Sequence, residues 1–171
     1  GQNSNAVAEL AIAMMIFMSR NKFTPGTGME IKGKKVGIQA YGNVGRLVAE
    51  KAKALGMDVM AFDPFVPAEK MIEDGVTPAE SLEKMYEQCN FISLHIPAIP
   101  ATIGSINYNL ITRMPKNGCL VNTARKEIIN EPELEKVLAD RPDLRYVTDV
   151  AAACQAELDE KFPKQVFATP K

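Results

Sequence analysis

The sequence lacks most of the features by which composition reveals a partner. Its 20 Lys and Arg residues are balanced by 21 Asp and Glu residues without a basic run, so nothing favours nucleic acid or an anionic membrane. Its three cysteines are too far apart for a disulfide framework or a metal site. The longest apolar run, Leu10 to Met18, is nine residues, against the ~20 needed to span a bilayer. With no recognisable signal peptide, we expect a soluble cytoplasmic protein without a metal.

What the sequence does contain is enough apolar material for one globular domain, with 46% hydrophobic residues in 171. A helix is expected through "AVAELAIAMMIFMSRN", with Ser4 or Asn5 as its N-cap. Apolar residues occupy nearly every side of this helix, so it must be covered on several sides. We expect Met14, Met15 and Met18 to serve packing, in part against a second copy of the chain.

Beyond the loop "NKFTPGTG", short β-type apolar runs alternate with helical ones. The expected strands are Lys35 to Gln39, Asp58 to Phe62, Phe91 to His95, Cys119 to Asn122, Tyr146 to Val150 and Val166 to Thr169. The expected helices are Val44 to Leu55, Ala79 to Cys89, Tyr108 to Arg113 and Glu131 to Asp140. This alternation predicts an α/β fold, a doubly wound parallel sheet of Rossmann type in a single domain. Ligands of such sheets bind at the carboxyl ends of the strands.

A glycine-containing turn follows the first expected strand in "VGIQAYGNVGR". Gly42 would let the backbone approach a pyrophosphate, Gly45 would let helix and strand pack closely, and the helix would point its N-terminus at the anion. Ala40 stands where a first glycine is expected. Its methyl costs about 1 to 2 kcal/mol if that position needs a positive φ, and little otherwise. The candidate cofactor-binding residues of this turn are Tyr41, Gly42, Asn43, Val44 and Gly45.

Asp63 directly follows the second expected strand, 18 positions after Gly45. This spacing is close to the ~20 typical of the acid that hydrogen-bonds the adenosine ribose diol. Its charge would repel a 2′-phosphate, which favours NAD over NADP. The alternative is a solvated Asp-Pro turn.

Two further residues follow strands at the same expected edge. Arg125, in "NTARKE", has the forked guanidinium that binds a carboxylate in a bidentate way, although an Arg at a surface is also commonly just solvated. His95 is the only histidine and invites a role as general acid or base. Because it lies between Leu94 and Ile96, we expect it to pack near the cofactor instead.

Several ordered blocks together resemble the NAD-binding domain of the D-2-hydroxyacid dehydrogenases, most closely the phosphoglycerate dehydrogenase branch. They are "GQNSNAVAEL", "GKKVGIQAYGNVGR", "FDPF", "SLHIP", "MPKNGCLVNTARKEIINEPEL" and "VTDV". The resemblance covers essentially the whole chain. It implies that residues 1–171 are the NAD-binding domain cut from a two-domain enzyme and that the substrate-binding domain is absent. It also implies that two copies of the chain form a homodimer through the first helix.

The resemblance also implies roles by position. It places the phosphate turn at Gly42 and Gly45 and the ribose acid at Asp63. It places His95, Ile96 and Pro97 in a loop against the cofactor, Thr123 and Ala124 beside the nicotinamide, Arg125 on the substrate carboxylate, and Asp149 on the carboxamide.

Two departures from the family pattern bear on catalysis. Cys154 stands where a Glu is usual, and Pro170-Lys171 replaces the usual Pro-His, as in a branch of phosphoglycerate dehydrogenases that is similar in having Lys there. The implied enzyme oxidises 3-phosphoglycerate to 3-phosphohydroxypyruvate in serine biosynthesis, with Arg125 and Lys171 as catalytic residues. Lys171 would need a pKa well below the ordinary ~10.4 to act as a base. We expect this chain alone to bind NAD and to turn over little substrate.

Three other readings stay open. The chain could be a non-enzymatic NAD(H)-sensing, corepressor-like module, against which Arg125 argues, or could serve another D-2-hydroxyacid dehydrogenase. A methyltransferase that binds a nucleoside-sulfonium cofactor would also use Asp63, but it has no role for the "NTAR" block.

Overall fold

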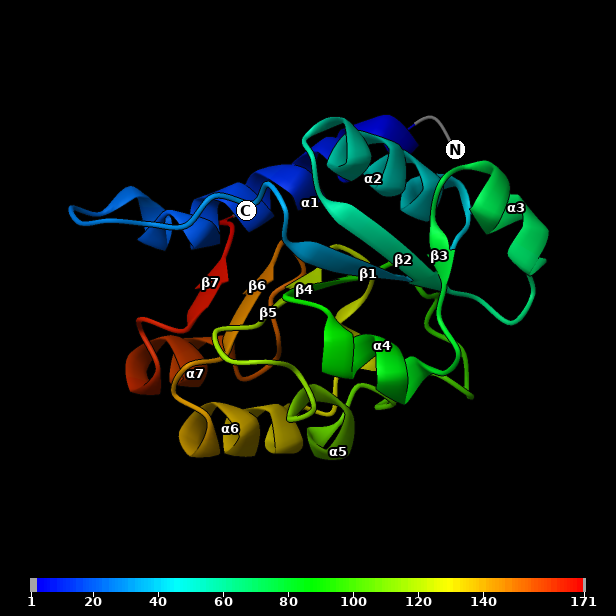
Figure 1. Ribbon diagram of the computed structural model, residues 1–171. Helices are drawn as coiled ribbons and strands as arrows, with labels where there is room; N and C mark the ends of the chain where they lie inside the picture. Colours follow the sequence, from blue (N-terminus) through cyan, green and yellow to red (C-terminus); the bar gives the residue numbers. More distant parts are fainter. Residues whose placement is uncertain (1–2, 171) are drawn as a thin grey trace.

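The computed structural model describes residues 3–170, whose core is one sheet of seven parallel strands in the order β3-β2-β1-β4-β5-β6-β7. Figure 1 shows this sheet between two layers of helices. The strands are β1 (Lys35–Gln39), β2 (Asp58–Phe62), β3 (Thr77–Pro78), β4 (Phe91–Leu94), β5 (Cys119–Asn122), β6 (Arg145–Thr148) and β7 (Val166–Ala168). The predicted α/β fold with a doubly wound parallel sheet is therefore confirmed.

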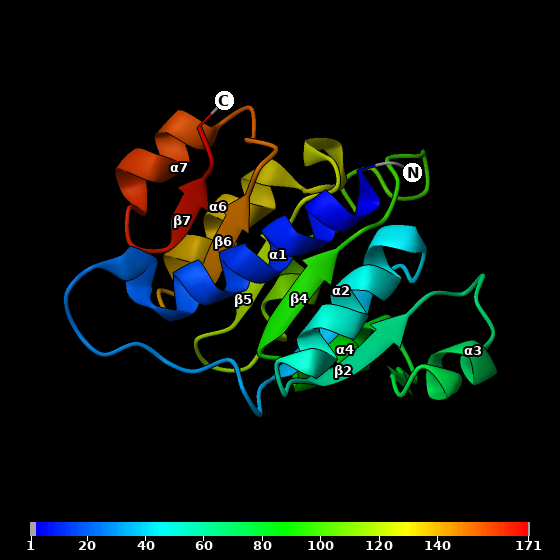
Figure 2. The same cartoon turned by 90° about the horizontal axis from the view of Figure 1, so that it is seen from above.

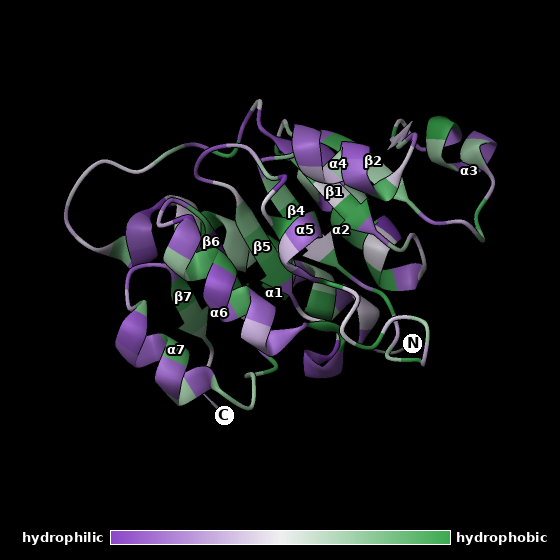
Figure 3. Cartoon of the chain, turned by 90° about the horizontal axis from the view of Figure 1, so that it is seen from below, coloured by the Kyte–Doolittle hydropathy of each residue, from purple (hydrophilic) through white to green (hydrophobic). Residues whose placement is uncertain are grey.

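Each face of the sheet carries its own helices (Figure 1). One face is covered by α1 (Ser4–Ser19), α2 (Asn43–Ala54) and α3 (Ala68–Glu73). The other is covered by α4 (Leu82–Gln88), α5 (Tyr108–Ile111), α6 (Glu131–Asp140) and α7 (Gln155–Lys161). From above, α1 and α2 lie side by side along the sheet (Figure 2). From below, the exposed sides of α6 and α7 are largely hydrophilic (Figure 3), as expected of helices that bury one stripe.

The order of the strands sets the place of the site. The chain runs outward from β1 to β2 and β3, then returns to place β4 on the other side of β1. The connections that leave β1 and β4 therefore diverge to opposite faces. This divergence opens a crevice at the carboxyl ends of those two strands, where ligands of such sheets bind.

The first helix differs from its prediction in two respects. It begins at Ser4 with Asn3 as N-cap and no side-chain capping bond, so the prediction of Ser4 or Asn5 as cap is wrong. Met14, Met15 and Met18 do serve packing, but they are 4%, 0% and 1% exposed within this chain, because α1 lies over β5 and β6 and beside α2. The prediction that these methionines pack against a second copy is therefore wrong.

The other boundaries agree closely where a strong apolar run defines the element. The bounds of β1, β2, β5 and α6 are those predicted, and α2 is shifted by one residue. The predicted strands at 91–95, 146–150 and 166–169 end one or two residues early. The predicted helix at 79–89 begins only at Leu82, because the Ser81 hydroxyl accepts a hydrogen bond from the Lys84 N–H and caps it there. The helix predicted to reach Arg113 ends at Ile111. Among the α-helices and β-strands of residues 3–170, α3, β3 and α7 were not predicted.

A left-handed turn connects α1 to the segment that leads into β1. Asn21, Lys22 and Phe23 have φ values of 52°, 59° and 58°. The Lys22 ammonium donates to the carbonyls of Pro163 at 2.6 Å and Val166 at 2.7 Å. The turn thereby fastens the edge strand β7. Among residues 3–170, none of the helices combines the length and apolarity needed to cross a membrane.

Candidate cofactor and substrate site

The two glycines of the turn after β1 play different parts. A Cβ added to Gly42 would meet nothing within 4 Å, so its backbone faces open space that a ligand can enter. A Cβ added to Gly45 would lie 2.3 Å from the Ala40 carbonyl oxygen. Gly45 is therefore needed for close packing of α2 on the turn, and the role of Gly42 in access stays a prediction.

Ala40 adopts the left-handed conformation, with φ of 79°. The position therefore does need a positive φ, and its methyl carries the full cost of about 1 to 2 kcal/mol. The Ala40 N–H donates to the Phe62 carbonyl at 3.0 Å, which ties this residue to the end of β2.

Asp63 lies directly beside the turn. Its Oδ2 accepts a hydrogen bond from the Tyr41 N–H at 2.8 Å, and its Oδ1 accepts one from the Phe65 N–H at 2.9 Å. Each carboxylate oxygen keeps a further lone pair, so the oriented group can still accept from a ribose diol. This is an ordered carboxylate and not merely a solvated Asp-Pro turn.

The Tyr41 side chain lies away from the crevice. It is 2% exposed, and its hydroxyl donates to Asp74 at the end of α3 at 2.7 Å. Burial and the neighbouring Asp74 raise the pKa of Tyr41. Of the residues predicted to bind the cofactor, Tyr41 therefore borders the site with its backbone alone.

Most of the remaining candidates line one cleft of about 460 Å³. The predicted residues in it are Val44, His95, Ile96, Pro97, Thr123, Ala124 and Arg125. Val7 and Ala98 complete the lining. Val7 was missed because it comes from α1, and only the packing of α1 beside α2 brings it there.

His95 is held in a neutral form. Its Nε2 lies 2.8 Å from the Ser93 hydroxyl, and burial lowers the pKa of the imidazole to about 4. An imidazole with that pKa carries little proton at neutral pH. This supports the expectation that His95 packs beside the cofactor instead of carrying the substrate proton.

A buried network shapes the loop that carries Arg125. Asn122 is 0% exposed, and its side-chain amide donates to the Arg125 carbonyl at 3.0 Å and to the Tyr146 hydroxyl at 3.1 Å. Its Oδ1 accepts from the Ala124 N–H at 3.0 Å. The Thr148 hydroxyl donates to the Asn122 carbonyl at 2.7 Å and accepts from Val150 at 2.9 Å. The ends of β5 and β6 are thus joined.

The predicted catalytic residues are only partly placed. Arg125 is exposed in the cleft, where one Nη donates to the Ala124 carbonyl at 2.8 Å and its other donors remain for a ligand. Asp149 is half-buried just after β6, outside the residues that line the cleft. Lys171 lies outside the described residues. At Cys154 the backbone N–H donates to Glu131 at 3.3 Å, so an acid from α6 lies beside this residue.

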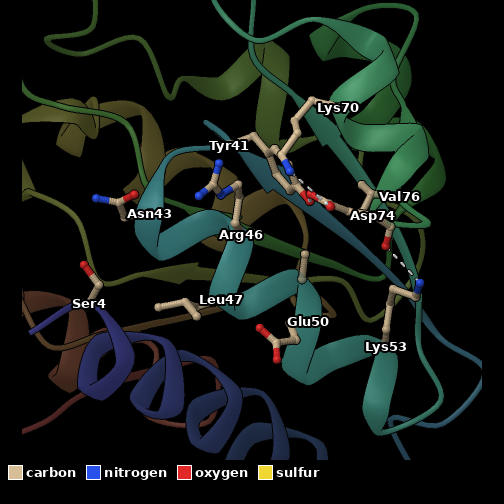
Figure 4. A pocket seen from close by; sticks show the side chains of 11 residues that line it. Ser4, Tyr41, Asn43, Arg46, Leu47, Glu50, Lys53, Lys70, Asp74 and Val76 are labelled. Atoms are coloured by element: carbon tan, nitrogen blue, oxygen red, sulfur yellow. Dashed lines mark hydrogen bonds and ion pairs between the residues drawn. The ribbon is translucent and has the colours of Figure 1, made fainter.

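These features fit a dinucleotide. Above Gly42 there is open space, beside the turn stands an oriented carboxylate, and the buried Thr123 hydroxyl in the cleft has no hydrogen-bond partner in residues 3–170. A larger hollow of about 690 Å³ lies along the outer side of α2 (Figure 4), and of the predicted residues Tyr41 and Asn43 line it. The sheet order and the turn define a dinucleotide-binding domain of the Rossmann type.

Comparison with known proteins gives the family. Residues 9–170 match the model of the D-isomer specific 2-hydroxyacid dehydrogenase, NAD binding domain. The chain belongs to this family of oxidoreductases, and its cofactor is NAD.

The individual relatives are dehydrogenases named for different substrates. The chain is 32% identical to the D-3-phosphoglycerate dehydrogenase of Methanocaldococcus jannaschii, over 81% of the chain and 29% of that protein. It is 33% identical to the (S)-sulfolactate dehydrogenase of Chromohalobacter salexigens, over 82% and 50%. The NAD+-bound 3-phosphoglycerate dehydrogenase of Entamoeba histolytica superimposes with a TM-score of 0.92 at 43% identity, over 99% of the chain and 54% of that structure. The chain thus spans about half the length of these relatives, or less.

Proposed function

We propose that this chain is the NAD-binding domain of an enzyme that oxidises 3-phosphoglycerate to 3-phosphohydroxypyruvate, a reaction of serine biosynthesis. One observation carries the proposal. A single cleft brings the Arg125 guanidinium next to Thr123 and Ala124, on the loop that the Asn122 network fixes. A carboxylate bound by Arg125 would therefore lie beside the cofactor. The similarity to phosphoglycerate dehydrogenases of two organisms supports the choice of substrate.

Bound NAD would supply the hydride acceptor. The chain's own residues would bind the cofactor and orient the substrate. Backbone N–H groups of the turn would hold the pyrophosphate, and the Asp63 carboxylate would hold the adenosine ribose and repel a 2′-phosphate. Thr123, Ala124 and Asp149 would hold the nicotinamide end. Arg125 would align the substrate carboxylate by a bidentate contact, and the neutral His95 would exclude water without adding charge.

Proton transfer is assigned to Lys171. We propose that its amine accepts the hydroxyl proton of the substrate, which requires a pKa lowered by burial or by nearby cations. The opposite wall of the cleft would come from a substrate-binding domain. Replacement of Lys171 by Gln should then lower kcat far more than it changes KM in a protein that carries both domains.

A different 2-hydroxyacid is the second candidate substrate. The similarity to (S)-sulfolactate dehydrogenase favours it, because sulfolactate also has an anionic group next to a hydroxyacid. Arg125 would bind the carboxylate in either case, so the choice depends on residues that contact the other anion.

We also propose a homodimer through the outward side of α1. Ala6 and Ala13 are exposed there, and Leu10 and Phe17 are only half-buried. Light scattering should give a dimer mass, and Leu10→Glu should give a monomer. A monomeric mass for the unsubstituted chain at high concentration would contradict the dimer.

Titration with NADH tests the cofactor site. The chain has no tryptophan, so NADH fluorescence can be followed without a competing indole signal. We expect saturable NADH binding and much weaker NADPH binding, with the difference reduced in Asp63→Ser. Equal binding of both nucleotides by the unsubstituted chain would refute the assignment of Asp63.

Binding of 3-phosphoglycerate to the NADH-saturated chain tests the role of Arg125. Glycerol 3-phosphate is the matched control ligand, because it keeps the phosphate and lacks the carboxylate. NMR shifts of Ala124 and Arg125 should respond to 3-phosphoglycerate alone, and Arg125→Gln should abolish the response. An equal response to both ligands would argue against carboxylate binding.

A further inference from the structure

The phosphate turn of this chain contains an alanine in a conformation that favours glycine. Ala40 has φ of 79°, and its carbonyl oxygen lies where any side chain on Gly45 would collide with it. The turn therefore has one required shape, and residue 40 lacks the freedom of glycine to adopt it. Some other group must favour that shape.

Residue 41 is fixed at both of its ends. Its main-chain N–H donates to Asp63 at 2.8 Å, and its side-chain hydroxyl donates to Asp74 at 2.7 Å. The ring between these bonds is 2% exposed. A residue held on both sides of its Cα in this way restricts the rotation of the peptide that joins it to Ala40.

Asp74 is itself anchored. Its Oδ1 lies 3.5 Å from the Lys70 ammonium, and its main-chain carbonyl accepts a hydrogen bond from Lys53 of α2 at 2.9 Å. Figure 4 shows the Tyr41 hydroxyl and the Lys70 ammonium meeting at Asp74, with Lys53 at its carbonyl. The hydrogen bond from Tyr41 is the main cause that lowers the pKa of Asp74, so the acceptor is ionised at neutral pH. The anchor thus connects α2, α3 and the turn.

We propose that Tyr41, anchored on Asp74, is the positioning residue that keeps Ala40 left-handed and so holds the turn in the shape that binds NAD. The inference rests on the proposed cofactor site at this turn. It assigns the Tyr41 side chain a role on the far side of the turn from the cofactor. It also explains how the chain retains a nucleotide site without its first glycine.

A double-mutant cycle tests the link between residues 40 and 41. Tyr41→Phe keeps the buried ring and removes only the hydroxyl, and Ala40→Gly removes the need for an anchor. With Ala40 present, Tyr41→Phe should weaken NADH binding about five- to ten-fold, the effect of one ordinary hydrogen bond lost. In the Ala40→Gly background, the same change should weaken binding less than about two-fold.

Two control variants separate positioning from general damage. Tyr108→Phe removes a similar tyrosine bond to a carboxylate, from Tyr108 to Asp140 at 2.8 Å, far from the turn, and should leave NADH affinity unchanged. Asp74→Asn keeps an acceptor for the hydroxyl and should bind NADH within about two-fold of the unsubstituted chain, whereas Asp74→Ala should behave like Tyr41→Phe.

Urea unfolding of the four proteins of the cycle gives a readout that does not need NADH. Tyr41→Phe should raise the unfolding constant about five-fold more with Ala40 present than in the Ala40→Gly background. Coupling in urea without any NADH binding would refute the cofactor site and leave the Tyr41–Ala40 link standing. Equal effects of Tyr41→Phe in both backgrounds, in NADH affinity and in urea, would overturn the inference.

Discussion

On the β1 side of the crevice the surface that faces a ligand is mostly backbone, whereas on the β4 side it is mostly side chain. Gly42 offers bare main chain at the start of α2, and the Asp63 carboxylate is bonded to the main-chain N–H of Tyr41 beside it. Across the crevice, the ligand-facing groups His95 and Arg125 are held by buried polar residues behind them. The first half depends on steric fit, and the second on satisfied hydrogen bonds. Substitutions in the two halves should therefore change stability and NADH affinity in different ways.

Gly45→Ala should have the largest effect on stability. The new Cβ would lie 2.3 Å from the Ala40 carbonyl oxygen, so α2 must move away from the turn. We expect a loss of about 3 kcal/mol in the free energy of unfolding and no measurable NADH binding. Urea unfolding and NADH titration measure both. A stable Gly45→Ala protein with normal NADH affinity would break the view of this half as a steric fit.

Asn122→Leu tests the other half. Leucine is similar in size, but it leaves the Ala124 N–H and the Arg125 carbonyl without their buried partner. The expected loss is about 2 to 3 kcal/mol, by urea unfolding. Asn109→Leu is the matched control, since Asn109 is exposed and its side chain accepts a hydrogen bond from Arg113, and it should change stability by less than about 0.5 kcal/mol. Similar losses in both variants would mean that the buried network does not define this half.

The pH dependence of stability should reveal the burial of His95. Its pKa is lowered from 6.5 to about 4 in the folded chain, so between these values the unfolded chain binds a proton that the folded chain does not. The free energy of unfolding should fall by about 2 to 3 kcal/mol from pH 6.5 to pH 4 for this reason, and this loss should level off below pH 4. Since His95 is the only histidine, His95→Gln should remove this part of the slope and leave that of the carboxylates. The same slope of the free energy of unfolding against pH in both proteins would mean that His95 is exposed to solvent.

Gly42→Ala should have the smallest effect on stability and sharpens the contrast with Gly45. Its Cβ would meet nothing within 4 Å and its φ is −87°, so the free energy of unfolding should change by less than about 0.5 kcal/mol. NADH affinity should nevertheless fall about ten-fold, because the methyl would occupy space needed by the pyrophosphate. Unchanged affinity in this stable variant would mean that the ligand does not approach Gly42.

Most of the sheet could be predicted because its strands are short apolar runs. β1 and β5 are buried on both faces, β2 is buried on one face and half-buried on the other, and all three have the predicted bounds. By contrast, β3 is only two residues at the sheet edge and ends in proline, so it has no such run. The helices α3 and α7 are six and seven residues long and rich in charge, too short for a clear period.

The site could be predicted where one stretch of chain carries its own signal. The turn, Asp63 and the "NTAR" loop are of this kind: Asp63 lies beside the turn, and Thr123, Ala124 and Arg125 line the cleft. The supports of the site could not be predicted, because they join distant residues. The Tyr41 hydroxyl meets Asp74, 33 positions away, and Asn122 meets Tyr146, 24 positions away. Nor could the sequence decide the φ of Ala40, which the surrounding packing sets.

The two hydrogen bonds from Lys22 to carbonyls near β7 affect when this strand joins the sheet during folding. They join residues 141 and 144 positions apart, so their loop-closure entropy is high and we expect them to form late in folding. The strand that they fasten has three residues and one neighbour, β6. We therefore expect the amide hydrogens of β7 to exchange with solvent through a smaller opening than those of β5, which lies between two strands. We therefore expect β7 to join the sheet last during folding and to separate from it first during local opening.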